Sequence, residues 1–199
     1  LKMDCLGRST LTLIYDCLEE IKRTTGETLD IDAIPLDNEK AYKIFQDGQT
    51  YGVFQFESSG MRDILRKARP ERLDDLIALN ALYRPGPMDN IPAYIRRKHG
   101  QEAVTYLHPL LEPFLKRTYG VFVYQEDIMA AARALGGFSG PKADTLGYAI
   151  RKKQRDVLAG LEEEFIRQAA ERGVDRGVIT RVFEAFEPFA NYGFNKAHA

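Results

Sequence analysis

The sequence has 199 residues, of which 44% are hydrophobic and 29% are charged, as is typical of a globular protein. A net charge of −1 gives no overall attraction to nucleic acid, so an electrostatic role needs local clusters of cations. No apolar run approaches the roughly 20 residues of a membrane-spanning helix, and no signal peptide is visible. Cys5 and Cys17 are too few for a disulfide framework or a zinc site, and we expect two buried, reduced thiols in a cytosolic protein.

The first half of the chain is predicted to be mainly helical. Residues 1–7, LKMDCLG, are expected to end a strand, where Asp4 suits a metal ligand or catalytic carboxylate, and equally a helix cap or turn. A helix then runs from Ser9 or Thr10 to about Thr24. Further helices are expected over about 38–45, 57–68, 71–83 and 91–100, with a short strand or buried turn at 53–56.

The second half repeats this helical character without repeating a motif. His108 is expected to cap a helix through Leu115, and residues 118–124 alternate as a buried extended segment. Four more helices are predicted over about 125–135, 139–153, 155–172 and 175–187. The fold is therefore mainly α, with a few short extended segments. The lack of strand–helix alternation and of a glycine-rich phosphate loop argues against a doubly wound nucleotide-binding fold.

The stretch ALYRPGPM at 81–88 holds one arginine in a rigid turn. Pro85 disfavours a helical conformation at Arg84, so the arginine leaves the preceding helix in an extended conformation at a set angle. The alternative is a simple helix stop, which is the commoner meaning of such a turn.

Four stretches place a cation, amide or carboxylate beside an aromatic residue and a glycine: GVFQFESSGM, LYRPGPM, TYGVFVYQED and NYGFNKAHA. Aromatic faces can stack on bases while cations hold phosphates, which suits binding of nucleotides or single-stranded nucleic acid. The alternative is that the aromatic residues fill the core and the glycines mark turns.

Taken together, longer stretches resemble the C-family of bacterial replicative DNA polymerases, in the fingers region of the DNA polymerase III alpha subunit. They are LKMDCLGRSTLTL, IPLDNEKAYKIFQDGQTYGVFQFESSGM, ALYRPGPMDNIPAYIRRKHG, HPLLEPFLKRTYGVFVYQEDIM and FANYGFNKAHA, in the family's order. The resemblance implies a piece of a longer polymerase, in which residues 1–7 end the palm domain and residues 8–199 form the multi-helix fingers domain.

The resemblance also implies the chemistry. Asp4 matches the third of three palm carboxylates that hold Mg²⁺ ions for two-metal nucleotidyl transfer. The other two are expected upstream of this sequence, so the isolated chain is expected to be inactive.

The fingers are expected to bind the incoming deoxynucleoside triphosphate (dNTP) and to help position the templating base. The residues expected at the phosphates are Arg84, Lys152, Lys153, Asn195 and Lys196, and weaker candidates are Tyr124, Gln125 and Arg151. The family pattern often has two arginines and a glycine where this chain has Gly147, Tyr148 and Arg151, which leaves open which cation of that helix acts.

The implied partners are primer–template DNA, dNTP, a sliding clamp, a clamp loader and a proofreading exonuclease, in the bacterial cytoplasm at the nucleoid and without a membrane. A second hypothesis is a helical module that binds nucleic acid or protein without polymerase activity. A pair of aspartates spaced by one residue upstream would favour the enzyme.

Overall fold

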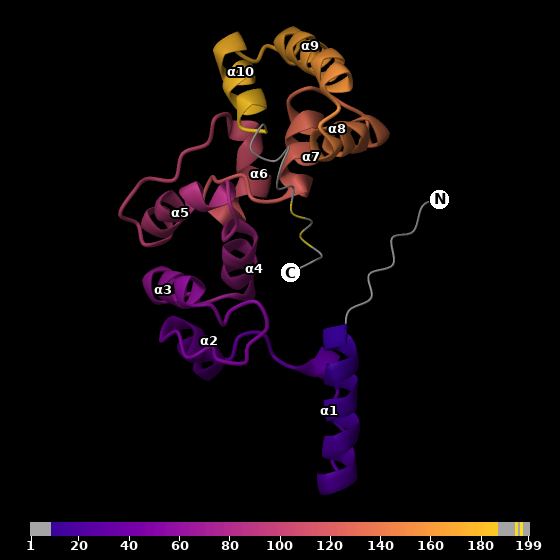
Figure 1. The fold of residues 1–199 in the computed structure, drawn as a ribbon. Helices are drawn as coiled ribbons and strands as arrows, with labels where there is room; N and C mark the ends of the chain where they lie inside the picture. Colours follow the sequence, from indigo (N-terminus) through magenta and orange to yellow (C-terminus); the bar gives the residue numbers. More distant parts are fainter. Residues whose placement is uncertain (1–8, 187–193, 195, 197–199) are drawn as a thin grey trace. The chain divides into compact units, whose positions relative to one another are not determined.

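The computed structural model describes residues 9–186, 194 and 196 (Figure 1). The chain divides into two compact units, residues 1–36 and 37–199. In the first unit, α1 (Ser9–Thr25) is followed by the 3-10 helix η1 (Ile31–Ala33). Cys17 on α1 is exposed, so the expectation of two buried thiols is wrong for this residue. Asp4, Cys5 and the predicted palm boundary lie outside the described residues, and that boundary stays a prediction.

The second unit consists of helices joined by short turns. Their bounds are α2 (Glu39–Gln46), α3 (Ser59–Ala68), α4 (Leu73–Leu82), η2 (Pro87–Asn90), α5 (Ile91–Lys98), η3 (Pro109–Leu111), α6 (Glu112–Leu115), η4 (Lys116–Thr118), α7 (Gln125–Ala134), α8 (Gly140–Lys152), α9 (Arg155–Glu171) and α10 (Arg176–Glu184). The mainly α fold is confirmed. Among the described helices, none has both the length and the apolar composition required to traverse a bilayer.

Short polar side chains fix where several of these helices begin. Asn38, Ser58, Ser139 and Asp175 each accept a hydrogen bond from a backbone amide in the first turn of the helix that follows. Such caps satisfy amides that have no partner inside the helix. The Nδ1 atom of His108 likewise accepts from the amide of Leu110 at 3.2 Å, which confirms the predicted cap.

Two hydrophobic clusters form the core of this unit. One is built from α6 to α10 and includes the fully buried Phe165 and Phe186. The other is built from α2 to α5 and includes Met61 and Tyr94. In Figure 1, α9 and α10 lie together beyond α7 and α8.

The extended segment 121–124 supplies side chains to both clusters. Val121 and Val123 join the cluster around α4, whereas Phe122 joins the cluster around α7. Alternate residues of an extended chain point to opposite sides, which explains this division. Strict alternation would place Tyr124 with Phe122, but Tyr124 joins the cluster of the two valines. Tyr124 is the N-cap residue of α7, and the alternation ends there.

The segment 53–56 is a turn, with no strand among its residues. Gln55 has a φ of 65° and Gly52 a φ of 75°, and such positive values break an extended conformation. Of the two predicted alternatives, a short strand or a buried turn, the turn is therefore correct. Its predicted burial is wrong for Phe54, which is exposed.

Asp127 fixes the start of α7 from inside the core. One of its carboxylate oxygens accepts hydrogen bonds from the amides of Val123 and Tyr124 at 3.0 and 2.8 Å. Burial raises the pKa of the Asp127 carboxyl to about 6, although the two amide bonds act in the opposite direction. The protonated carboxyl is therefore the better tolerated form in the folded chain.

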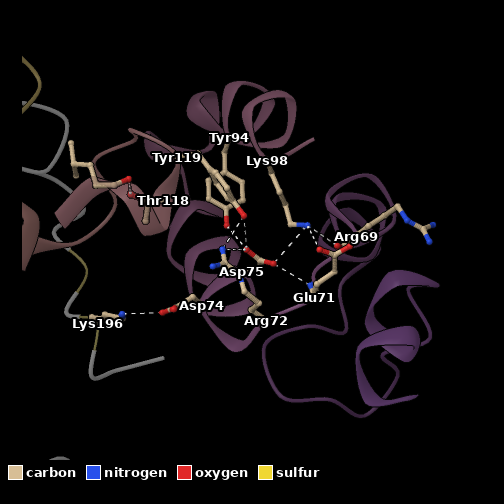
Figure 2. A network of polar contacts seen from close by, with 11 residues as sticks. Arg69, Glu71, Arg72, Asp74, Asp75, Tyr94, Lys98, Thr118, Tyr119 and Lys196 are labelled. Atoms are coloured by element: carbon tan, nitrogen blue, oxygen red, sulfur yellow. Dashed lines mark hydrogen bonds and ion pairs between the residues drawn. The ribbon is translucent and has the colours of Figure 1, made fainter. Parts of the chain in front are cut away.

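Asp75 joins three parts of the fold through a buried carboxylate (Figure 2). Its side chain is 1% exposed and forms an ion pair at 3.7 Å with Lys98 of α5, itself 4% exposed. It also accepts hydrogen bonds from Tyr94 at 3.2 Å and from the amide of Glu71 at 3.1 Å. The hydroxyl of Tyr119, a residue of the turn before segment 121–124, lies 3.5 Å from a carboxylate oxygen of Asp75. A basic run such as residues 96–99 commonly forms a solvated helix face, but the Lys98 side chain is buried.

We predict that Asp75→Ala lowers the free energy of unfolding by about 3–5 kcal/mol. The variant removes one of the two carboxylates near the buried Lys98 ammonium, which keeps Glu71 at 3.6 Å, and it removes the acceptor of the Tyr94 hydroxyl. Urea denaturation of the wild-type chain and the variant measures this loss. Asp63→Ala is the control, since Asp63 pairs with Arg66 at 2.6 Å on the surface and should cost much less. Equal losses in the two variants would contradict the assignment.

The raised pKa of Asp127 predicts a pH dependence of stability. The folded chain holds this proton more tightly than the unfolded chain, so the stability that Asp127 contributes falls as pH rises from about 4 to 6. With a pKa of about 6 against an ordinary value of about 4, the fall is about 3 kcal/mol. The side chain of Asp127→Asn does not titrate. The unfolding free energy of the wild type should therefore fall relative to that of the variant as pH rises over this range. A wild-type advantage that grows with pH would refute it.

Candidate functional site

The Arg84 turn follows directly from the end of α4. The amide of Arg84 donates to the carbonyl of Leu82 at 2.8 Å, and the Arg84 carbonyl accepts from Met88 at 3.2 Å. Gly86 has a φ of 102° and Pro87 opens η2, so the two prolines lie on either side of a position that only glycine adopts easily. The turn therefore fixes the point at which the chain leaves α4, and the extended conformation of Arg84 stays a prediction.

The Arg84 side chain reaches a residue 110 positions later in the chain. Its guanidinium carbon lies 4.2 Å from the centre of the Phe194 ring, which is a cation–π contact. The Phe194 side chain is buried, with 2% exposure. The Phe194 carbonyl accepts from the amide of Gln125 at 3.0 Å, and Tyr124 and Phe194 form a parallel bridge. Three of the four polar-aromatic stretches therefore meet at this point.

Lys196 extends the same junction. Its ammonium lies 3.1 Å from a carboxylate oxygen of Asp74 on α4 (Figure 2) and 5.4 Å from the centre of the Tyr124 ring. Its backbone amide donates to the carboxylate of Glu126 at 3.2 and 3.3 Å. We call Arg84, Tyr124, Gln125, Phe194 and Lys196 the cationic junction.

Tyr124 contributes an uncharged aromatic ring to this junction. Its side chain is buried, and burial, followed by the nearby carboxylate of Asp127, raises the pKa of its hydroxyl. The phenol therefore keeps its proton at physiological pH and presents a ring face rather than a charge to the Lys196 ammonium.

The last turn of α8 holds the other predicted cations. Arg151 lies 5.6 Å from the centre of the Tyr148 ring, and Lys152 ends α8. Lys153 follows with a φ of 53°, and all three cations are exposed. No contact among the described residues joins them to Arg84 or Lys196. The cations expected at the phosphates therefore form two separate groups in this part of the chain.

Gln125 connects α7 to α8. A Cβ atom at Gly147 would lie 2.9 Å from the Nε2 atom of Gln125, so a side chain at this position would displace the amide. Gly147 thus makes room for the side chain of Gln125. Of the remaining predicted site residues, Asn195 and Asp4 lie outside the described residues.

The described residues do not provide a metal site. Within residues 9–186, 194 and 196, no group of three or more histidine, cysteine, aspartate or glutamate side chains lies close enough to hold an ion. The predicted Mg²⁺ therefore depends on Asp4 and finds no fit among the described side chains.

Two other arginines, Arg62 and Arg66, lie four residues apart on α3, a spacing that places them on one helix face and would suit a polyanion. In the structure Arg62 donates to the carbonyl of Gly48 at 2.7 Å and lies 3.7 Å from the centre of the Tyr51 ring. Arg66 pairs with Asp63 and donates to the carbonyl of Asp47 at 3.2 Å. Both therefore hold the turn after α2 in place.

One hollow has a volume of about 740 Å³ and lies along α2 and Glu71, and none of the cationic junction residues lines it. Its lining includes Asp37 and Glu39 as well as Glu71. Lys40 and Lys43 also line it, but the carboxylates outnumber them and leave no net positive charge for a phosphate, so we place the candidate site at the junction instead.

Asp74 and Glu126 are the site residues that sequence reasoning missed. Each lies in the first turn of a helix, where acidic residues are common because they favour the positive end of the helix dipole, and this explanation hides a second role. The signal that could have revealed them is their position in the sequence. Asp74 lies ten residues before Arg84, and Glu126 directly follows Gln125.

The comparisons with known proteins bear on the whole chain. Residues 10–173 match the family described as the bacterial DNA polymerase III alpha subunit finger domain. Over its full length the chain is 48% identical to DNA polymerase III subunit alpha of Aquifex aeolicus. It is 46% identical to that of Halalkalibacterium halodurans and 45% identical to that of Chlamydia trachomatis.

These relatives are much longer proteins. Each alignment covers the whole of this chain but only 17%, 18% and 16% of the length of the three relatives, respectively. The match spans the Arg84 turn and both halves of the helical unit. The chain therefore belongs to the bacterial DNA polymerase III alpha subunit finger domain family.

Proposed function

We propose that this chain is the fingers region of a DNA-directed DNA polymerase, where it binds the incoming dNTP and helps to position the templating base. The observation that carries the proposal is the convergence of Arg84 and Lys196, 112 residues apart in the sequence, on the buried ring of Phe194 and on Tyr124. Membership in the family favours this function over a binding module without polymerase activity.

Arg84 suits the triphosphate because of its geometry. The guanidinium carbon lies 4.2 Å from the centre of the Phe194 ring, and a planar guanidinium can donate in parallel pairs to phosphate oxygens. The Pro85–Gly86–Pro87 turn limits the freedom that Arg84 would lose on binding. Lys196 adds an ammonium as a point charge beside it.

The other predicted residues have supporting roles in this proposal. Lys152 and Lys153, with Arg151 beside them, would approach the phosphates from the end of α8. Asn195 lies between the two described residues of the junction in the sequence. Gln125 and Tyr124 would contact the base or the sugar.

The chemical step belongs to a larger assembly. Bound Mg²⁺ ions would activate the primer 3′-hydroxyl and neutralise the leaving pyrophosphate. Asp4 is the one residue of this sequence that we assign to them, together with carboxylates outside it, so the isolated chain should not polymerise. Primer–template DNA, a sliding clamp, a clamp loader and a proofreading exonuclease are the proposed partners, in the bacterial cytoplasm at the nucleoid.

We predict that Arg84→Ala in the intact polymerase raises the KM for dNTP by about tenfold or more, because a charged hydrogen bond to phosphate contributes about 1.5–3 kcal/mol. The affinity for primer–template DNA should change little. Single-nucleotide incorporation over a dNTP series measures the KM, and fluorescence anisotropy measures DNA binding.

Arg84→Lys should give an intermediate KM, since it keeps the charge but loses the paired donors. Arg167→Ala is the matched control, because Arg167 pairs with Glu171 at 3.0 Å on the surface of α9. An unchanged KM in Arg84→Ala would reject the proposed function.

A further inference from the structure

Lys196 is already engaged by an anion in this structure. Its ammonium lies 3.1 Å from Asp74, and the two side chains are 32% and 30% exposed. A phosphate that binds this ammonium must therefore compete with the Asp74 carboxylate.

We propose that Asp74 is a positioning residue that holds Lys196 in the nucleotide-free state and is displaced by the triphosphate. The inference rests on the proposed function, because it takes the triphosphate to be the ligand of Lys196. In this account Asp74 keeps the ammonium beside Tyr124, lowers the affinity for nucleotide, and gives up its ion pair when dNTP arrives.

The exchange costs little because both partners are partly solvated. Ion pairs exposed to this degree contribute only about 0–1 kcal/mol to stability, whereas a triphosphate brings several negative charges. Asp74 also lies in the first turn of α4, where the positive end of the helix dipole favours a carboxylate with or without Lys196. The released carboxylate therefore remains in a favourable environment.

The backbone around Lys196 is held independently of Asp74. The amide of Lys196 donates to Glu126 at 3.2 and 3.3 Å, and the Phe194 carbonyl accepts from Gln125 at 3.0 Å. The guanidinium of Arg84, which follows the other end of α4, lies 4.2 Å from the centre of the Phe194 ring. Breaking the Asp74 pair should therefore free the ammonium without releasing residues 194 and 196 from α7.

The test is a double-mutant cycle in the full-length polymerase, read by single-nucleotide incorporation on primer–template DNA. Asp74→Asn should lower the KM for dNTP by about two- to fivefold, the range that a partly exposed ion pair supports, with kcat unchanged. Lys196→Gln should raise the KM. The double variant should match Lys196→Gln, because Asp74 acts only through Lys196.

Two further variants separate positioning from a general effect on charge or folding. Asp74→Glu keeps the carboxylate and should restore most of the wild-type KM. Asp63→Asn removes an exposed carboxylate that pairs with Arg66 at 2.6 Å and should leave the KM unchanged. The gain in Asp74→Asn should also shrink as salt is added, since screening weakens the pair in the wild type.

The outcomes distinguish this inference from the proposed function. If Lys196→Gln raises the KM but Asp74→Asn does not lower it, the positioning role is wrong and the nucleotide site stands. Additive effects in the double variant would also overturn the role. If Lys196→Gln leaves the KM unchanged, Lys196 does not bind the triphosphate, and both ideas fail at this residue.

Discussion

The buried carboxylate of Asp75 is the constraint on which the geometry of the site depends. It fixes α4 against α5 through Lys98 and Tyr94, and against the turn at Tyr119. The neighbouring residue Asp74, in the first turn of α4, forms the ion pair with Lys196, and the other end of α4 is followed by the Arg84 turn. Because one short helix carries both features, anchoring that helix sets the distance between the two cations of the junction.

The junction combines strong positional control with weak individual interactions. Arg84 is held by an aromatic ring, and Lys196 by a partly exposed carboxylate. The Lys196 contact costs little to exchange, since both of its side chains are partly exposed. The buried elements around them, Tyr124 and Phe194, supply the rigidity. Such a site can present cations to a polyanion without being built around it.

Local sequence signals predicted much of the fold. Helix caps such as Ser58 and Asn38 are local, and so the helix starts could be read from single residues. The Arg84 turn was equally accessible, because two prolines and a glycine restrict the backbone by themselves. The placement of Lys98 and Asp74 could not be read in this way, since both depend on partners on other helices. A basic helix end and an acidic first turn already explain these residues locally, and tertiary contacts give them their second role.

The central claim is that Arg84 and Lys196 bind the phosphates of one nucleotide. A structure of the intact polymerase with primer–template DNA and an incoming dNTP tests it most directly. The account predicts that the Arg84 guanidinium and the Lys196 ammonium each lie within about 3 Å of a phosphate oxygen, with Asp74 no longer paired to Lys196. A triphosphate bound elsewhere, with Lys196 still paired to Asp74, would contradict it.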